Sequence, residues 1–432
     1  MTFEQALHYI NQLDESRMRF DLTLSQKILE RLGRPDQKLK SIIVSGTNGK
    51  GSVCAFLTSM AKQAGIKVGT YTSPHLVSPL ERIAIDGTPI SEICFASLVT
   101  ELKAVIEQSP SGQITYFEVF TLLSTLAFVQ ANVELAIFEV GLGGRLDTTN
   151  ILERIGTITT SIDFDHTQIL GTSLSEIATE KIAIMRKNCP AIVSKQLDGV
   201  QKQIIESGKS IGTKLNMENV DYIVNGDATS FYFSNKEARI GPLHLGLYGD
   251  HQIHNAGCAA AMALELSKQG FYISSDSISK GLGNVAHPAR LERWLNSKGQ
   301  EVWLDVGHNP SAIKSVVKFL RKEKFFPIDI VLGVLKDKDW KKMIEELLPI
   351  ASSMTLCKPQ TPRAWDLDQA SKEIGDKIVT RIVPHPSEAF DQAILSSSRL
   401  LCIGSFYTIG AVRPLLPKKG YQLVVRPSCI YQ

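Results

Sequence analysis

The segment SGTNGKGS, residues 45–52, places three glycines around one lysine. It follows a short β-forming run at 41–44 and precedes a run at 53–60 whose apolar residues recur at helical spacing. Glycines let the backbone curl so that its N–H groups face one point, and Lys50 adds its charge to the partial charge of the helix N-terminus. A loop of this kind binds an anion, most often the phosphates of a nucleotide.

The spacing departs by one residue from the usual phosphate-binding loop. That loop reads Gly-x4-Gly-Lys-Ser/Thr, whereas here Lys50 is followed by Gly51 and the hydroxyl comes at Ser52. The local pattern therefore also fits a glycine-rich turn with a solvated lysine, and the rest of the sequence has to decide between the two.

Polar residues stand at the ends of several predicted strands, where parallel α/β sheets build their sites. Ser73 follows the strand in GTYTSPHL, Glu139 ends LAIFEV, and Asp163, Asp165 and His166 end TSIDFDH. A hydroxyl, a carboxylate and an imidazole beside a phosphate loop suit magnesium, with the phosphates completing its coordination shell. Taken singly, a strand-end glutamate is more often a capping or ion-pairing residue, and a lone histidine is usually structural.

Alternating strand-like and helix-like segments predict the α/β framework that positions these residues. Residues 220–249 differ, because apolar and polar residues alternate between turn signals, which favours a small antiparallel patch. A second α/β series restarts at VWLDVG. We predict a P-loop-type, mostly parallel ATPase domain over 1–295 and a Rossmann-like α/β domain over 296–432.

Composition fits a soluble protein of two domains, because 432 residues are too many for one ordinary core. A net charge of +3 is too mild to favour nucleic-acid binding. The seven cysteines are scattered without a C-x-x-C pair, which favours buried thiols in a reducing compartment. Acidic residues in the N-terminal helical pattern argue against a signal peptide, and no apolar run reaches 18 residues. We expect a cytoplasmic protein that binds no membrane.

A series of motifs in a fixed order carries a family resemblance. From residue 45 to 413 the chain reads SGTNGKGS, TSPHL…ERI, TYFEVFT, EVGLGGRLDTTN, DHTQILG…IATEK, HQIHNAG, DVGHNP and GSFYTIGAVR. The chain resembles the bacterial folylpolyglutamate synthase/dihydrofolate synthases of the Mur ligase superfamily along nearly its whole length. The displaced hydroxyl at Ser52 is usual in that family.

The resemblance implies ATP-dependent amide ligation in folate biosynthesis and one-carbon metabolism. ATP would phosphorylate a carboxylate of dihydropteroate or of a reduced folate, and the amine of L-glutamate would attack the acyl phosphate. Two domains closing over a cleft would exclude the water that hydrolyses this intermediate.

The resemblance also implies residue roles in the nucleotide and metal sites. Lys50, His166 and Lys181 would be catalytic, with Lys181 carbamylated so that it supports the second of two Mg²⁺ ions. The metal ligands would be Ser73, Glu139, His166 and the modified Lys181. ATP would contact Asn48, Gly49, Lys50, Gly51, Ser52, Asn255, Arg290, Asp305 and His308. Without the resemblance, Lys181 would be a surface lysine beside Glu180 on an amphipathic helix.

The pterin side is the least specific part of the resemblance. Its residues would be Phe20, Asp21, Leu22, Thr115, Tyr116, Phe117, Glu118, Leu146, Asp147 and Thr148, with Arg82 as a candidate for binding a carboxylate. Phe117 would stack on the ring and Asp147 would bind its amino groups. The alternative is that Phe20 and Phe117 are core aromatics.

The chain departs from the family pattern at Leu80, usually Asn, at Ile182-Ala183, usually Ala-Gly, and at Ala289, usually Gly. Every implied phosphate and metal ligand is nevertheless present.

Two other functions compete with a folate ligase. A Mur-type ligase for a cell-wall precursor is disfavoured because about 40 residues before the loop leave no room for a separate UDP-binding domain. A nucleotide-binding switch would need neither the strand-end metal set nor Asp305. We expect a monomer with small-molecule substrates only.

Overall fold

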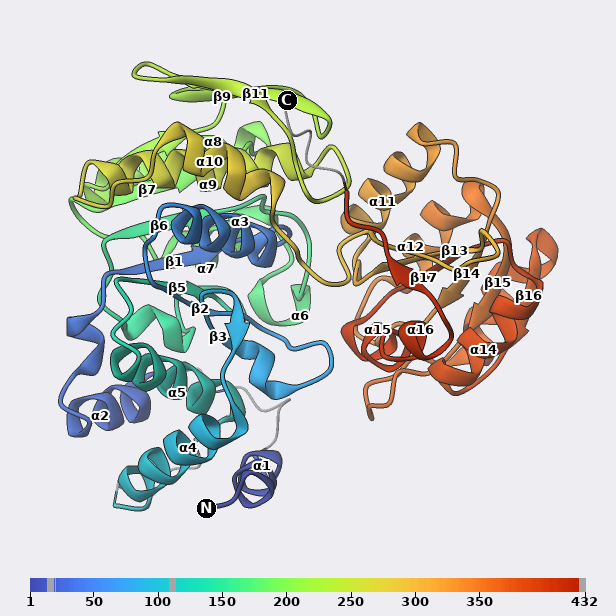
Figure 1. The fold of residues 1–432 in the computed structure, drawn as a ribbon, viewed down its shortest axis with the longest axis horizontal. Helices are drawn as coiled ribbons and strands as arrows, with labels where there is room; N and C mark the ends of the chain where they lie inside the picture. Colours follow the sequence, from blue (N-terminus) through green and yellow to red (C-terminus); the bar gives the residue numbers. More distant parts are fainter. Residues whose placement is uncertain (14–18, 20, 109–113, 427–432) are drawn as a thin grey trace. The chain divides into compact units, whose positions relative to one another are not determined.

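The computed structural model describes residues 1–13, 19, 21–108 and 114–426 (Figure 1). The chain divides into two compact units, one of Met1–Leu243 with Ile253–Val285 and one of His244–Gln252 with Ala286–Gln432. The division at Val285 lies ten residues before the predicted boundary at 295. The physical reason is that the strand Glu292–Leu295 pairs with the sheet of the second unit.

The first unit is built on an eight-stranded sheet of order β4-β3-β2-β5-β1-β6-β7-β8. Its strands are β1 Ser41–Ser45, β2 Val68–Tyr71, β3 Ile83–Ile85, β4 Thr88–Pro89, β5 Leu135–Glu139, β6 Gly156–Thr159, β7 Pro190–Val193 and β8 Lys214–Met217. The pairings from β2 to β8 are parallel, and β3 and β4 run antiparallel at the edge. Every residue of β1 is buried, which explains its β-branched apolar run.

The helices of this unit alternate with the strands, as the sequence predicts. They are α1 Phe3–Asn11, α2 Thr23–Arg31, α3 Lys50–Gln63, α4 Glu92–Glu107, α5 Tyr116–Gln130, α6 Thr167–Leu170, α7 Leu174–Ile182, α8 Asp198–Ile211, α9 Gln252–Ser267 and α10 Ser275–Gly283. The helices α3 and α10 lie side by side (Figure 1), close enough that a Cβ at Gly281 would stand 2.6 Å from the Cα of Met60.

Two predictions about this unit have distinct outcomes. The antiparallel patch is confirmed as a three-stranded sheet of β9 Tyr222–Asp227, β10 Ser230–Asn235 and β11 Arg239–Leu243. The apolar spacing of LSEIATEKIAIMRK, residues 174–187, predicts a helix over the whole run, but α7 ends at Ile182. Beyond that end, Arg154 donates to the carbonyl of Ile184 and Arg186 to that of Ala183, so side chains satisfy backbone groups that a longer helix would pair.

The second unit is a seven-stranded sheet of order β16-β15-β14-β17-β13-β12-β18. Its strands are β12 Glu292–Leu295, β13 Glu301–Asp305, β14 Ile328–Leu332, β15 Ala351–Leu356, β16 Val379–Ile382, β17 Arg399–Ile403 and β18 Gln422–Leu423. Its helices are α11 Pro310–Lys322, α12 Trp340–Leu347, α13 Leu367–Ile374, α14 Pro386–Ser396, α15 Phe406–Val412 and α16 Leu415–Lys418. Strands β13 to β17 pair in parallel, which confirms the predicted second α/β layer.

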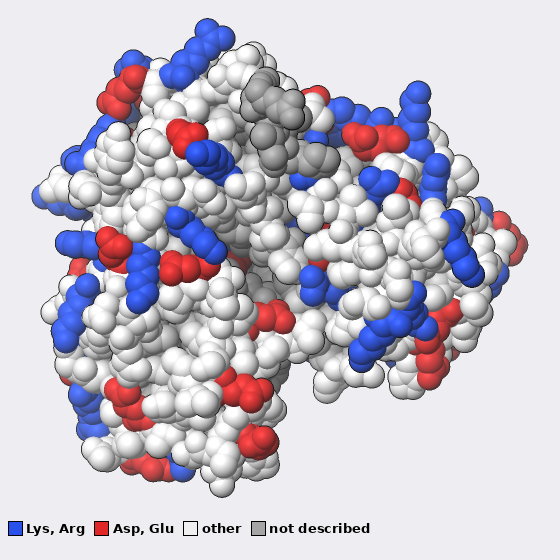
Figure 2. Space-filling view, in the orientation of Figure 1, with Lys and Arg blue, Asp and Glu red and all other residues white. Residues whose placement is uncertain are grey.

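Surface charge agrees with the composition. On the face drawn in Figure 2, basic and acidic side chains lie interspersed, as a net charge of +3 implies. Within the described ranges, no helix combines the length and apolarity needed to cross a bilayer.

Candidate active site

The loop between β1 and α3 has the geometry of an anion cradle. Gly46 and Gly49 have φ of 136° and 93°, which side-chain-bearing residues rarely adopt. A Cβ at Gly46 would lie 1.8 Å from the hydroxyl oxygen of Thr160, and one at Gly49 would lie 2.2 Å from Oδ1 of Asn255. The loop therefore requires glycine at both positions, and Asn255 lies against it.

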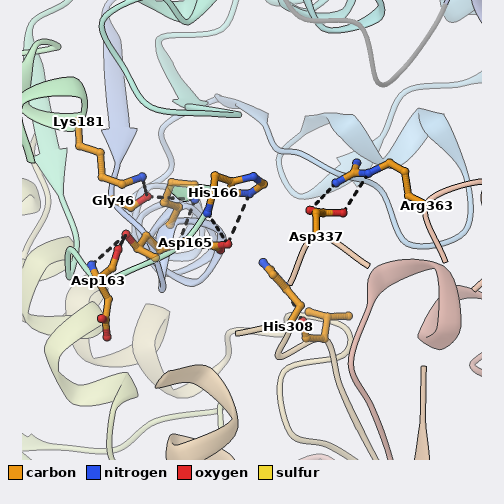
Figure 3. Close-up of polar contacts among 11 residues, drawn as sticks. Gly46, Asp163, Asp165, His166, Lys181, His308, Asp337 and Arg363 are labelled. Carbon is orange, nitrogen blue, oxygen red and sulfur yellow. Dashed lines mark hydrogen bonds and ion pairs between the residues drawn. The ribbon is translucent and has the colours of Figure 1, made fainter. Parts of the chain in front are cut away.

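Two lysines meet at this loop. The Nζ of Lys50 donates to the carbonyl oxygens of Gly46 and Thr47, at 3.2 Å each. The Nζ of Lys181, from α7, donates to the same Gly46 oxygen at 2.9 Å (Figure 3), and its side chain is buried. Two ammonium groups that share one acceptor repel each other, so an anion bound at the loop lowers the energy of the pair.

The strand-end residues lie where the parallel sheet predicts. Ser73 follows β2 and Glu139 ends the neighbouring β5, and the N–H of Ser73 donates to Oε2 of Glu139 at 3.1 Å. Glu139 is only 5% exposed. A buried carboxylate beside a hydroxyl-bearing residue at this edge supplies oxygen ligands of the kind that magnesium prefers.

His166 begins α6 with a left-handed backbone, φ 49°. Its N–H donates to Oδ1 of Asp165 at 2.9 Å, and its Nε2 lies 3.9 Å from the same oxygen (Figure 3). In the described part of the chain, no group of three His, Cys, Asp or Glu side chains is placed to hold a metal ion by itself.

Asp147 braces the turn that follows β5. One carboxylate oxygen accepts from the N–H groups of Gly141 and Leu142, at 2.9 and 3.1 Å, and the other accepts from the N–H and the hydroxyl of Thr149. Burial raises the pKa of this carboxyl, although the four hydrogen bonds oppose that shift. The contacts give Asp147 a structural role, and pterin binding by its carboxylate stays a prediction. Leu146 and Thr148 flank it in the same turn.

The segment Thr115–Glu118 forms the N-terminal cap of α5. Thr115 and Glu118 make a reciprocal capping box, and the hydroxyl of Ser25 donates to Oε1 of Glu118 at 2.6 Å. Phe117 rests on the chain at Gly141, where a Cβ would lie 2.3 Å from its ring.

Arg82 is buried over aromatic rings rather than exposed. Its guanidinium carbon lies 4.9 Å from the ring centre of Tyr116 and 5.2 Å from that of Phe120, and its Nε donates to Nδ1 of His75 at 2.9 Å. Burial, with Arg82 adding to it, lowers the pKa of His75 to about 4, so His75 accepts this bond as a neutral ring.

The N-terminal part of the predicted pterin loop is only partly described. Phe20 lies outside the described residues. Asp21 is exposed and binds the N–H and hydroxyl of Thr23, which lower the pKa of its carboxyl, while Leu22 precedes the first turn of α2.

The second unit places Arg290 and His308 beside Phe406. Arg290 lies 5.4 Å from the ring centre of Phe406, and the ring of His308 lies 6.1 Å from it. Asp305 ends β13 and is buried, and burial raises the pKa of its carboxyl. Its oxygens accept from the N–H groups of Leu291 and Gly307, so Asp305 fixes the backbone beside Arg290.

The sequence did not predict the side-chain contacts that connect the loop after β1, the turn after β5 and the neighbouring segments. Thr47 exchanges hydrogen bonds with the backbone of Asp163, at 3.0 Å each, and Ser45 donates to the carbonyl of Gly143. Arg145 pairs with Glu180, the neighbour of Lys181, at 2.8 Å. The motif EVGLGGRLD contains this arginine, but its partner appears only in the fold.

The comparisons with known proteins cover both units. The family model of the Mur ligase middle domain matches residues 44–263, and that of the Mur ligase, glutamate ligase domain, matches residues 289–406. A dihydrofolate synthase/folylpolyglutamate synthase of Bacillus subtilis (strain 168) is 34% identical over 406 residues, which are 90% of this chain and 94% of the relative.

Solved structures agree. Folylpolyglutamate synthase of Mycobacterium tuberculosis, complexed with ADP, superposes with a TM-score of 0.88 at 29% identity, over 96% of this chain and 98% of that one. The bifunctional folylpolyglutamate synthase/dihydrofolate synthase of Yersinia pestis, complexed with AMPPNP and a Mn ion, superposes with a TM-score of 0.85 at 28% identity, over 96% and 98%. With its lysine-bearing glycine loop and matches over both units, the chain belongs to the Mur ligase family, among the folylpolyglutamate synthase/dihydrofolate synthases, which are ATP-dependent ligases.

Proposed function

We propose that the protein joins the amino group of L-glutamate to the carboxylate of dihydropteroate and to the glutamate tail of reduced folates. The observation that carries the proposal is the glycine loop between β1 and α3, where Nζ of Lys50 lies 3.2 Å from the carbonyl oxygens of both Gly46 and Thr47. This arrangement concentrates positive charge where a carboxylate and a γ-phosphate, both anions, must approach each other.

The reaction has two steps. A carboxylate oxygen of the folate attacks the γ-phosphorus, ADP leaves, and an acyl phosphate forms. The neutral amine of L-glutamate then attacks the acyl carbon, and phosphate leaves with the bridging oxygen. Lys50 and the loop N–H groups would offset the charge that develops on the phosphoryl oxygens. Residues 1–295 would bind ATP and folate, with Arg290, Asp305 and His308 serving the nucleotide.

Ser73, Glu139 and His166 would hold Mg²⁺, and the hydroxyl, carboxylate and imidazole fit a hard cation whose remaining ligands are phosphate oxygens. When bound, the ion would offset phosphate charge and orient the γ-phosphate. The Mn ion of the Yersinia pestis structure supports a divalent metal.

We also propose that Lys181 is carbamylated and supports a second ion. Its conversion to an anion would replace the repulsion between the two lysines by attraction. Growth on ¹³C-labelled bicarbonate followed by ¹³C NMR tests this, because the carbamate carbon should give a resonance that Lys181→Ala lacks. An identical spectrum from the two proteins would contradict the assignment.

Bifunctionality is tested by assaying the enzyme with dihydropteroate and with a reduced folate side by side. We expect product from both, and Asp21→Ala should impair dihydropteroate use more, because this substrate has no glutamate tail to help position it. An enzyme that extends reduced folates but makes no dihydrofolate would refute bifunctionality.

The same assays separate the rival functions. A ligase for another acid would use neither dihydropteroate nor a reduced folate, and a nucleotide switch would hydrolyse ATP without needing L-glutamate. We predict a monomer, which sedimentation equilibrium would test.

A further inference from the structure

Arg290 lies between two residues with unusual backbone conformations. Ala289 has φ 58° and Leu291 has φ 49°, both in the left-handed region that disfavours residues with a Cβ. Such conformations persist only where the surrounding structure imposes them, and they cluster at functional sites. The family usually has glycine at the position of Ala289. Because alanine has a Cβ, the left-handed backbone conformation costs this chain conformational energy that glycine would avoid.

Hydrogen bonds to buried groups impose the turn. The N–H of Ala289 donates to Oε2 of Glu292 at 3.0 Å, and the carbonyl of Ala289 accepts from the N–H of Val306 at 3.0 Å. On the other side of Arg290, the N–H of Leu291 donates to Oδ2 of Asp305 at 2.8 Å. Glu292 and Asp305 are 8% and 7% exposed, so both carboxylates depend on these partners.

Arg413 holds the Glu292 carboxylate in place. Its Nε lies 2.9 Å from Oε2 and its Nη2 lies 2.8 Å from Oε1, the two-pronged geometry of a strong arginine–carboxylate pair. Oε2 therefore accepts from both Arg413 and Ala289. Arg413 follows α15, whose first residue, Phe406, lies against Arg290. The first residue of α15 thus contacts the Arg290 side chain, and Arg413, just after the helix, acts through Glu292 on the backbone of the neighbouring Ala289.

We propose that Glu292 and Arg413 are positioning residues, which hold Arg290 in the conformation that meets a nucleotide phosphate. The inference rests on the proposed function, because it takes Arg290 as a phosphate contact. Arg413 also keeps the Glu292 carboxylate paired, so that this anion, two residues from Arg290, does not compete with phosphate for the guanidinium. The proposal therefore assigns a function to Arg413, the last residue of the motif GSFYTIGAVR.

The test compares Glu292→Gln and Arg413→Gln with the wild-type enzyme. We expect KM for ATP to rise about tenfold in each, which is the lower end of the loss seen when the hydrogen-bond partners that orient metal ligands are removed. The KM for the folate should stay within about twofold, since a phosphate contact does not touch that substrate. Direct titration with ADP should show the same loss of affinity without turnover. Arg413→Lys keeps the charge but not the fork, so it should show a smaller rise and serves if the stronger variants fail to fold.

Glu301→Gln is the matched control. Glu301, in β13, pairs with Arg293, the neighbour of Glu292 in β12. The side chains of Glu301 and Arg293 are 12% and 26% exposed, against 6% and 28% for Glu292 and Arg413. Arg293 is adjacent to Glu292 in β12, so its side chain points to the opposite face of the sheet. We expect this variant to lower Tm without changing KM for ATP.

Arg290→Ala separates the inference from its premise. If Arg290→Ala raises KM for ATP while Glu292→Gln and Arg413→Gln lower only Tm, the positioning role is overturned and the phosphate contact stands. If Arg290→Ala leaves KM for ATP unchanged, the phosphate role of Arg290 fails, and the positioning role fails with it. A rise in all three variants, with Glu301→Gln unchanged, supports the proposal.

Discussion

At the residue scale, chemistry depends on where single charges are held. Lys50 belongs to α3 and Lys181 to α7, yet both donate to one carbonyl oxygen in the glycine loop after β1. The glycine pattern predicted the first lysine, because a strand, a glycine loop and a helix are adjacent in sequence. The resemblance alone brought in Lys181, since its partner Gly46 lies 135 residues away.

Lys50→Ala should remove most ATP turnover while leaving the fold intact. Loss of one charge-assisted contact to the developing phosphoryl charge costs about 3 kcal/mol, or roughly a hundredfold in rate. Steady-state assays with circular dichroism check both halves of this prediction. Lys62→Ala is the control, because Lys62 lies on the same helix and donates to the carbonyl of Asp86, and it should keep its rate. Near-normal turnover in Lys50→Ala would remove the phosphate-loop assignment.

Gly49→Ala should weaken ATP binding more than its backbone strain explains. The new Cβ would lie 2.2 Å from Oδ1 of Asn255, so the loop or the amide has to move. Gly65→Ala separates the two effects, because Gly65 also has a positive φ, 76°, but nothing within 4 Å of its Cβ position. Both variants should lose about 1 kcal/mol of stability from strain, but only Gly49→Ala should raise KM for ATP. Equal KM values would mean that Asn255 is not a nucleotide contact.

At the element scale, strands and helices were largely predictable, and the turns between them were not. Apolar runs and glycine loops marked β1, β2, β5 and β6 together with α3. The turn after β5 is held by Asp147, whose partners Gly141, Leu142 and Thr149 are backbone groups that no composition pattern reveals. The sequence therefore indicated that Asp147 matters and predicted that it binds the pterin. The structure shows in addition that its carboxylate accepts hydrogen bonds from the backbone of this turn.

Asp147→Asn should destabilise the first unit by roughly 1–3 kcal/mol, because the amide cannot accept on both sides and leaves buried N–H groups unpaired. Urea denaturation measures this loss. If the carboxylate also binds the pterin, KM for dihydropteroate should rise in the same variant. Unchanged stability would contradict the brace, whatever happens to KM.

At the scale of the whole molecule, local pattern predicted two α/β units, and long-range pairing decided where they divide. The domain predicted over 1–295 includes residues 292–295, but these form a strand that pairs with β13 and so belong to the second unit. Similarly, Glu292 and Arg413 are 121 residues apart in sequence. Contacts of this kind follow from tertiary structure, which is why neither the boundary nor the pair could be predicted.

Acid should destabilise the protein in part through His287. Burial, with Arg290 adding to it, lowers the pKa of His287 to about 3. As pH falls below 6.5 the unfolded chain takes up a proton that the folded chain refuses, so the free energy of unfolding decreases, by roughly 2 kcal/mol from pH 6.5 to pH 5.

His287→Leu should flatten that part of the pH dependence, because its unfolded state no longer gains this proton. Urea denaturation at a series of pH values measures the slope. His8→Gln, at an exposed position of α1, should leave the slope as in the wild type. An unchanged slope in His287→Leu would show that His287 is not the group responsible.

Ligation through an acyl phosphate is tested most directly by isotope transfer. Dihydropteroate labelled with ¹⁸O in both carboxylate oxygens is incubated with enzyme, ATP, Mg²⁺ and L-glutamate, and the released phosphate is examined by mass spectrometry. If the carboxylate attacks the γ-phosphorus, each phosphate released with product carries one ¹⁸O atom, and its release requires L-glutamate. Unlabelled phosphate accompanying labelled amide product would contradict the acyl phosphate, and phosphate release independent of L-glutamate and folate would contradict ligation itself.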